Sequence, residues 1–550
     1  MKHLSLLGDA VLRVAAEDDT AHTLSLPQLL ARLSAGDNLA FTALRPHQRP
    51  AWHAFLVQLA FLALEAGALT EPPQDAALWT NLLRALTPQH PGDEPWHLVV
   101  DDWTLPAFMQ SPCVAGAQGD YRNAAASAQE LDLLVTSKNH DEKIGKLRPV
   151  LPDEADVWAY ALLSLQGFAG FLGRGNFNTM RMNGGFGSRS QFRLVTQRGS
   201  GAEFLRDLRA LLAGADALWH DAQAMQIGTD GQAALLWLPT WGSAALPLQH
   251  VHPLCLEVTR RVRLRRCALG GLEMLSAASD TMRVAAKDAK GLVQDPWTPV
   301  IKEGEPRALT AQADAFSYHR LAPLLFDYTR CQLPLLARPT DAEIDSHANA
   351  TLVAQVLVGG SGRTDGVLRR EVWMPTHVLR KFATARGELA ARALVFIELA
   401  SLAQGRVLRA ALLQFVDGSA AVNWQNKDFG KAVTPWVNLL EERIDAVFFP
   451  VLFQTTTEPP MSDVDARTTW IDVLAGLVQE TFDAALTALP TRDRTHHVAR
   501  ARAARLLANA SRTHLQAEPR PELVSAAAKK KARGAKTSFT SGLTPTELIA

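Results

Sequence analysis

Hydrophobic positions in the last third of the chain recur with the period of an α-helix. Two apolar rows with seven-residue spacing run through 376–415: Phe382, Leu389 and Phe396, and Ala393, Ala400 and Val407. Rows of this kind form the seam of a helix bundle. Three further helical patterns cover 432–455, 464–489 and 492–511. The pattern therefore predicts a four-helix bundle over residues 375–515.

The preceding residues, 1–374, show no single period. Short apolar segments predict strands: a pair near the N-terminus, then "SQFRLVTQ", "ALLWLPTW" and "LCLEVTRRVRLRR". Helices are predicted after Pro27, from Trp52, and over 156–172 and 202–226. The predicted fold class is α+β: a large mixed N-terminal body with several short strands over 1–374, followed by the C-terminal four-helix bundle. A flexible basic tail is expected over 516–550.

Composition narrows the functional classes. The chain of 550 residues is too long for one core, and its 56 Lys and Arg balance its 56 Asp and Glu. Zero net charge argues against a bulk polycation that coats nucleic acid, so basic patches must be sought by position. Four separated cysteines, no secretory signal and no apolar run long enough to span a bilayer predict a cytoplasmic protein without a membrane partner.

One segment, 170–194, contains six glycines. Glycine lets backbone amides point at an anion or lets the backbone enter a narrow space. The segment lacks the Walker spacing and does not complete GxGxxG, so nucleotide binding is not indicated. The minor groove of DNA, about 6 Å wide, is a narrow space of this kind. The alternative is a glycine-rich crossover loop with solvated arginines. The candidate residues are Gly173, Arg174, Gly175, Asn176, Asn178, Asn183, Gly184, Gly185 and Gly187, with Arg174, Arg181 and Arg189 as candidate phosphate contacts.

Arginines gather at two further places. Arg260, Arg261 and Arg263 crowd a predicted strand, where like charges on one face favour an anion opposite them. In the last predicted helix, a basic stripe is expected opposite Val498 and Leu506; its members are Arg494, Arg502, Arg505 and Arg512. A phosphate track explains both sets. Solvated or acid-paired faces are the alternative.

A second glycine-rich stretch, "VGGSGRTDGVLRREVW", predicts a tight turn between two strands. Its candidate residues are Gly362, Arg363, Thr364, Asp365 and Gly366, with the three central residues expected at the tip. A plain β-turn is the alternative interpretation.

The polar segment "LLVTSKNHDEKIGKLRP" places His140 beside Asp141. No nucleophile frame and no metal-ligand spacing accompanies this pair, so we expect no enzymatic activity, no metal and no cofactor. The lysines around it suit a polar loop that contacts a phosphate backbone. Two alternatives remain open: a metal-free hydrolase or transferase that uses His140 and Asp141, and a scaffold that binds only protein, which internal pairing of the arginines with acids would favour.

In their order along the chain, these motifs resemble the CasA family, the large subunits of type I-E CRISPR Cascade complexes. The resemblance rests on "LSLLGDAVLRV", "PAFMQ", the glycine-rich segment before "SQFRLV", "ALLWLPTW", "LEVTRRVRL", "GGSGRTDGVLRRE" and the terminal bundle. It extends through nearly the whole chain, to about residue 515.

The resemblance implies a non-enzymatic, RNA-guided antiviral role. Large subunits of this family find the protospacer-adjacent motif (PAM) in double-stranded DNA. A glycine loop and a turn enter the minor groove, and a turn residue wedges the duplex open so that the guide RNA can pair and form an R-loop. The implied partners are target DNA, the crRNA 5′ handle, the backbone, handle-binding and small subunits, and a recruited helicase-nuclease.

The resemblance also assigns residues. The glycine loop corresponds either to 173–178 or to 184–187, and the wedge turn to 362–366. The family pattern has amide side chains in that turn, whereas this chain has Arg363 and Asp365. A carboxylate is repelled by phosphate, so Arg363 or Thr364 is the better candidate for DNA contact. Lys138, Asn139 and His140 are the candidates for docking on the crRNA handle.

Overall fold

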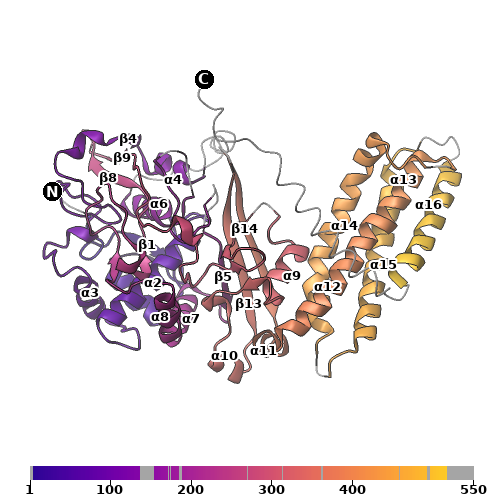
Figure 1. The fold of residues 1–550 in the computed structure, drawn as a ribbon, viewed down its shortest axis with the longest axis horizontal. Coiled ribbons are helices and arrows are strands. Elements are labelled where there is room, and N and C mark those ends of the chain that lie inside the picture. Colours follow the sequence, from indigo (N-terminus) through magenta and orange to yellow (C-terminus); the bar gives the residue numbers. More distant parts are fainter. Residues whose placement is uncertain are drawn as a thin grey trace. The chain divides into compact units, whose positions relative to one another are not determined.

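The computed structural model describes residues 4–136, 154–170, 173, 175–184, 189–268, 270–311, 314–360, 363–420, 422–457, 459–491 and 496–516, with the backbone alone for 359–360 and 363–365 (Figure 1). The chain divides into two compact units. The first, the body, comprises Met1–Ala393 and Phe453–Pro460. The second, the bundle, comprises Leu394–Leu452 and Met461–Ala550.

Helices α3, α6 and α7 of the body pack against the buried helix α2. The bounds of the body's helices are α1 Leu26–Ser34, α2 Arg49–Ala66, α3 Ala76–Ala85, α4 Ala128–Thr136, α6 Ala155–Phe168, α7 Ser200–Ala213, α8 Ala215–Ala224, α9 Tyr318–Phe326, α10 Asp341–Asp345 and α11 Thr376–Thr384. A capping box between Ser25 and Gln28 starts α1, beside the predicted Pro27. The single helix predicted over 202–226 is α7 and α8, which are separated at Gly214.

Short strands form several small sheets in the body. Their bounds are β1 Leu12–Ala15, β2 Ala21–Leu24, β3 Ala40–Phe41, β4 Arg122–Ala125, β5 Gln191–Val195, β6 Ala233–Leu235, β7 Val251–Leu256, β8 Arg261–Arg266, β9 Leu272–Ala277, β10 Val300–Ile301, β11 Arg307–Ala308, β12 Cys331–Gln332, β13 Ala350–Gly360 and β14 Arg363–Met374. The order within the sheets is β2-β1-β3, β11-β10-β12, β14-β13-β5, β4-β9-β8 and β6-β7.

The segment "LCLEVTRRVRLRR" contains two strands rather than the one predicted. β7 pairs in parallel with β6, whereas β8 pairs with β9 in another sheet. The chain leaves the first sheet between them because Arg260 turns inward and donates to the carbonyl oxygen of Gly170 at 2.8 Å. A buried arginine that donates to a carbonyl oxygen far along the chain leaves no local pattern in the sequence. The segment therefore looks like one continuous strand.

The sheet β14-β13-β5 carries the long hairpin. β5 runs antiparallel to β13, with Val195 opposite Thr351 and Gln191 opposite Gln355. β13 continues past the start of β5 through 356–360 and turns back into β14. At 3.3 Å per residue, these five positions carry the hairpin roughly 17 Å beyond β5.

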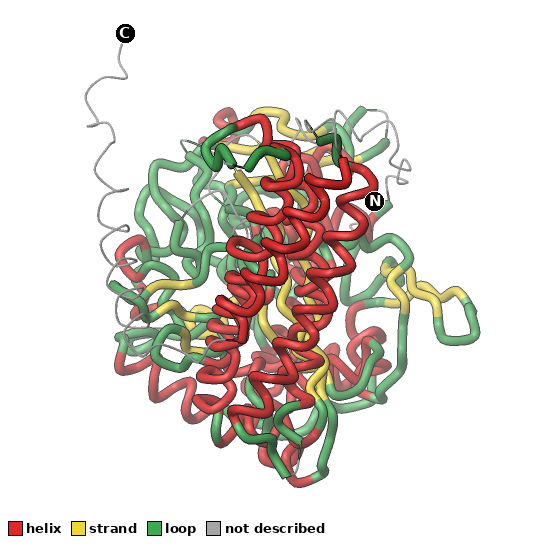
Figure 2. The backbone as a smooth tube through the Cα atoms, turned by 90° about the vertical axis from the view of Figure 1, so that its right-hand side faces the viewer, coloured by secondary structure: helices red, strands yellow, loops and turns green. Residues whose placement is uncertain are grey.

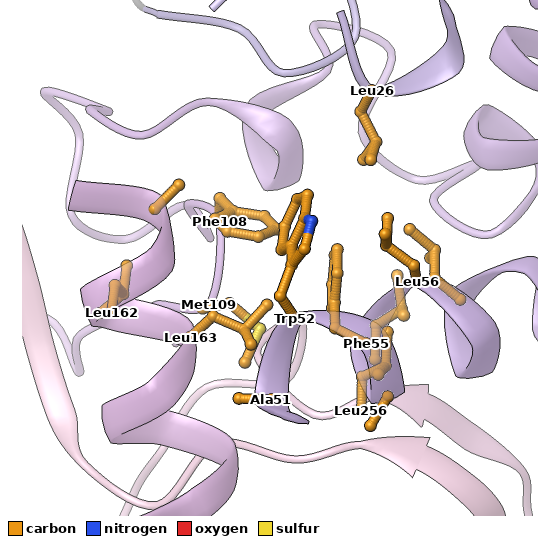
Figure 3. Close-up of a cluster of buried hydrophobic side chains, with 14 of the residues drawn as sticks. Leu26, Ala51, Trp52, Phe55, Leu56, Phe108, Met109, Leu162, Leu163 and Leu256 are labelled. Carbon is orange, nitrogen blue, oxygen red and sulfur yellow. The ribbon is translucent and has the colours of Figure 1, made fainter. Parts of the chain in front are cut away.

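Aromatic rings pack together within the mostly aliphatic core of the body. Trp52 and Phe55 of α2 stack at 5.5 Å between ring centroids, and Phe55 meets Phe108 edge-on at 5.6 Å. Leu162 and Leu163 of α6 lie in the same cluster (Figure 3). The apolar run from Ala54 is therefore a buried helix, as its pattern predicted.

The second unit consists of long helices that run alongside one another (Figure 2). Their bounds are α12 Arg386–Leu402, a π-helical segment Ala403–Leu408, α13 Arg409–Asp417, α14 Lys427–Gln454, α15 Asp463–Ala488, α16 His496–Ser511 and a π-helical turn Arg512–Gln516. Phe396 stacks on Trp470 at 4.9 Å, and Phe448 meets Trp470 edge-on at 5.8 Å. The α+β class, with terminal helices, is confirmed.

The two units divide at Ala393 and Leu394, within α12, whereas the sequence placed the boundary at residue 375. Helix α11 accounts for the difference, because Phe382 is buried in the body and meets Phe326 at 6.1 Å. The helical period runs on through Ala385, so it hides which unit α11 packs against. Of the tail predicted over 516–550, only Gln516 is described. No helix within the described ranges is long and apolar enough to cross a membrane.

Candidate nucleic-acid interface

The glycine-rich segment leaves α6 and is held against the body at its first half. Gly175 has φ +82°, and a Cβ there would lie 2.8 Å from the Ala278 Cβ. Its carbonyl oxygen accepts from the amide of Ser279 at 3.2 Å. Arg260 donates to the carbonyl oxygens of Gly170 and Phe177. Asn178 closes a turn by donating to the carbonyl oxygen of Thr179 at 2.9 Å. The close neighbour that demands glycine at residue 175 is therefore the protein itself.

Two other glycines of the segment face open space. Gly173 and Gly184 have φ +99° and +71°, and a Cβ at either would meet nothing within 4 Å. Asn183 and Gly184 are half-buried, and Asn176 donates its amide to the carbonyl oxygen of Gly173 at 3.0 Å. Such positions leave room for an external backbone. Arg174, Gly185 and Gly187 lie outside the described residues.

Buried arginines anchor the second half of the segment at both ends. Arg181 binds Glu257 at 3.1 Å and the carbonyl oxygen of Cys255 at 3.0 Å. Arg189 makes a two-pronged ion pair with Asp295. Its guanidinium also lies between the rings of Phe168 and Trp297, 5.2 and 5.0 Å from their centroids. These two arginines fix the loop from inside, so the expected phosphate contact is wrong for both.

The two acids that pair with these arginines, Glu257 and Asp295, have shifted pKa values. Burial raises the pKa of Glu257 to about 7, although Arg181 and the Met180 amide act in the opposite direction. Burial also acts to raise the pKa of Asp295, but Arg189 and Arg181 outweigh it, and that pKa lies below its ordinary range. Glu257 is therefore the acid near this loop that titrates close to neutrality.

The arginine strand β8 is covered by the protein. Arg263 is fully buried, lies 5.8 Å from the Trp103 ring and donates to the carbonyl oxygen of Leu105 at 3.0 Å. Arg261 is half-buried over the Tyr121 ring at 5.6 Å. Burial lowers the pKa of both Arg260 and Arg263 to about 10. The predicted phosphate contacts at Arg260 and Arg263 are thus replaced by internal ones.

The sequence contained a signal for this cover that the charge pattern obscured. The segment 101–116 is irregular and holds Trp103 together with two prolines. It lies over the face that Arg261 and Arg263 share, where Cys113, Tyr121 and Leu275 form a small second core. An aromatic loop near a row of arginines indicates cation–π packing as readily as a phosphate site.

The last helix exposes its arginines as predicted, but its packing face is shifted by one residue. Ala499, Ala503 and Leu507 are buried, whereas Val498 is 40% exposed. Arg502 and Arg505 are exposed, and Arg502 donates to the carbonyl oxygen of Gly418 at 2.5 Å. Arg494 lies outside the described residues. Arg512 is exposed as well and donates to the side chain of Asn509 at 2.7 Å, and Arg505 remains a candidate for a phosphate contact.

Two of the residues predicted at the tip of the hairpin, Arg363 and Thr364, are paired strand residues instead. They already belong to β14, where they face Gly360 and Gly359. The register shifts before Gly366, so Asp365 occupies a bulge, and Gly366 has φ +102°. The tip itself, Ser361 and Gly362, lies outside the described residues. The sequence located the turn but not the bulge, because both use glycine.

The expected crRNA-handle loop also lies outside the described residues, with Lys138, Asn139, His140 and Asp141. The helix that precedes it, α4, is held by Asp132. This buried carboxylate accepts from Arg45 at 2.5 Å and from Gln48 at 2.8 Å, and it pairs with His47 at 2.6 Å. Across the described part of the chain, no group of three His, Cys, Asp or Glu is arranged to hold a metal.

Comparison with known proteins bears on the fold. No protein-family profile matches the chain, and neither does any curated protein. Among solved structures, Cse1 from Acidimicrobium ferrooxidans aligns with a TM-score of 0.58 at 15% identity over 94% of this chain and 99% of its own. CasA (Cse1) of Thermus thermophilus gives 0.59 at 15% over 93% and 99%. Cse1 of Thermobifida fusca gives 0.61 at 15% over 93% and 98%. The chain has the CasA (Cse1) fold.

Proposed function

We propose that this chain is the large subunit of a type I-E CRISPR surveillance complex. It binds the crRNA 5′ handle and the neighbouring Cascade subunits, and it recognises the PAM in double-stranded DNA from the minor groove. It then wedges the duplex open to start the R-loop and recruits a helicase-nuclease. The subunit itself is not catalytic.

One observation carries the DNA-binding part of this proposal: the glycine segment and the hairpin emerge at the same end of one sheet. The chain enters β5 at Gln191, opposite Gln355 of β13. From that level β13 runs on to Gly360, so the hairpin extends on the side from which Arg189 and Ser190 lead into β5. A glycine-lined turn beside an extended hairpin suits a groove reader next to a wedge.

The open glycines support the same assignment. A backbone that follows the floor of a groove about 6 Å wide needs positions without a side chain. Gly184 meets that need, since a Cβ would find open space there. Gly173 does so as well, whereas Gly175 is filled from inside by Ala278. We place the groove contact at Gly184 and its two glycine neighbours, with Gly173 as the second candidate.

A scaffold that binds only protein is the second candidate function. Arg181 and Arg189 pair with buried acids, and Arg263 is covered by Trp103 and backbone carbonyls. These contacts remove three of the positive charges that the sequence offered to a polyanion. The scaffold would bind the same protein partners without reading a DNA motif.

The test is co-purification with type I-E subunits and guide RNA, followed by selection from a duplex library with a randomised PAM. We expect stable incorporation and enrichment of a short motif, and we expect Gly184→Asp to reduce affinity for that motif at least 100-fold. Incorporation without any enriched motif would favour the scaffold. A chain that joins no complex would overturn both candidates.

Gly304→Asp is the matched control. Gly304 has φ +79°, and a Cβ there also meets nothing within 4 Å, so both variants carry similar backbone strain. If Gly304→Asp lowers DNA affinity as much as Gly184→Asp does, the effect comes from strain and not from a groove contact.

A further inference from the structure

The body contains a second recess that shares no residue with the glycine segment. It is an open recess of about 560 Å³ bordered by residues of α2, α3, α8, β6 and β7 and of the segments next to them. Small-molecule pockets span about 300–1,000 Å³. Apolar groups make up most of its wall: Leu62, Leu86, Pro88, Leu235, Leu238 and Pro239. The recess is therefore of a size and character to hold a small ligand or a side chain.

A single carboxylate is fixed in this wall. Glu65 accepts from His252 Nε2 at 2.8 Å on one oxygen and from Trp219 Nε1 at 3.0 Å on the other. The amide of Leu254 donates to His252 Nδ1 at 2.9 Å. This hydrogen bond orients the ring so that Nε2 faces Glu65.

The carboxylate is ionised and accessible. Burial acts to raise the pKa of Glu65, but the hydrogen bond and the charge of His252, together with the hydrogen bond from Trp219, outweigh it, and the pKa lies below its ordinary value. The Glu65 side chain is 36% exposed. Each carboxylate oxygen has accepted one hydrogen bond, which leaves each with a further lone pair. Among the described residues of the wall, none is Lys or Arg.

We propose that this pocket binds a guanidinium group carried on an apolar stem. Guanidinium presents paired N–H donors that match the two free lone pairs of Glu65, and its stem lies along the leucine and proline wall. The indole of Trp219 also lines the recess. The group is supplied either by a free guanidine compound or by an arginine side chain of a partner chain. The inference does not rest on the proposed DNA function.

The experiment is isothermal titration of the full chain with two probes. Agmatine presents a free guanidinium on an alkyl stem, and N-acetyl-arginine methylamide presents the same group as a side chain within a peptide unit. We expect at least one probe to bind and Glu65→Gln to weaken its Kd at least tenfold. Butylurea, a neutral analogue, should not bind. Preference for agmatine points to a free ligand, and preference for the capped arginine points to a partner's side chain.

Two variants keep the result interpretable. Glu71→Gln removes a nearby acid that pairs with Arg209 at 3.3 Å on the surface and does not line the cavity, so it should leave the Kd unchanged. Leu238→Phe narrows the wall without touching Glu65, so it should weaken binding even if Glu65→Gln unfolds the chain. No binding of either probe, or an equal Kd for wild type and Leu238→Phe, would overturn the proposal.

Discussion

Arg189 and Arg505 are the same residue type in two regions, and the sequence made each a candidate for phosphate contact. In the body, Arg189 is buried, paired with Asp295 and enclosed by two aromatic rings. In the bundle, Arg505 is exposed on α16. Charge alone does not separate the two. What separates them is whether acids and rings from distant parts of the chain reach the guanidinium.

The arginines therefore fall into two classes, one buried and bound within the protein and one exposed on its surface. The buried class, with Arg181, Arg189, Arg260 and Arg263, shapes the glycine segment and the strand beside it. Its removal should affect stability and loop position. The exposed class can meet a polyanion, so its removal should change salt-dependent binding and leave the fold intact.

The largest effect is expected for Arg189→Met. The substitution leaves Asp295 buried without its ion pair, with hydrogen bonds from the Trp297 amide and Thr298 and the charge of Arg181 to stabilise it. Breaking a buried pair at one partner costs about 3–5 kcal/mol. We expect the free energy of opening at β5, measured by native-state hydrogen exchange, to fall by that amount.

Arg198→Met is the control for that measurement. Arg198 follows β5 in the same sheet and pairs with Glu371 at 2.5 Å, but its side chain is 69% exposed. Exposed pairs contribute only about 0–1 kcal/mol. If both variants lower the free energy of opening equally, burial does not distinguish the two classes and the comparison fails.

These contacts also show what the sequence could and could not predict. The bundle helices were predicted to within a few residues, because Phe396 and its neighbours repeat at helical spacing. The glycine loop was located by its glycine density. The sequence could not show that Ala278 fills the space beside Gly175, or that Trp103 covers Arg263, because those contacts join distant segments. Local pattern therefore found the elements and the loop, while tertiary contacts decided which glycine and which arginine remain open.

The pH dependence of stability tests the buried class through Glu257, the acid that pairs with Arg181. Glu257 has a pKa raised from 4.5 to about 7, so its contribution to stability is fully present below pH 4.5 and is lost as pH rises through 7. A shift of this size corresponds to roughly 3 kcal/mol. With Glu257→Gln, wild type should lose stability relative to the variant between pH 4.5 and 8, measured as the difference in thermal midpoint.

For Glu203→Gln, the stability difference from wild type should change with pH in the opposite direction. Burial acts to raise the pKa of Glu203, but its ion pair with Arg193 outweighs that effect, and the pKa lies below 4.5. Its contribution is present above pH 4.5 and is lost as pH falls. A midpoint difference for Glu257→Gln that is flat with pH, or that has the same sign as for Glu203→Gln, contradicts the buried assignment of Glu257.

The smallest effect on stability, and the sharpest on binding, is expected for Arg505→Ala. An exposed helical arginine away from packed contacts should change the unfolding free energy by no more than about 0.5 kcal/mol. If α16 meets phosphate in the assembled complex, the slope of log affinity against log salt should fall by about one. Arg500→Ala removes an equal charge from an exposed position of the same helix, about 140° away. A loss of slope at Arg505 alone means that one face of α16 docks on DNA. If the slope falls equally for both variants, binding depends only on the net charge of the helix. The exposed arginines then make no defined phosphate contact.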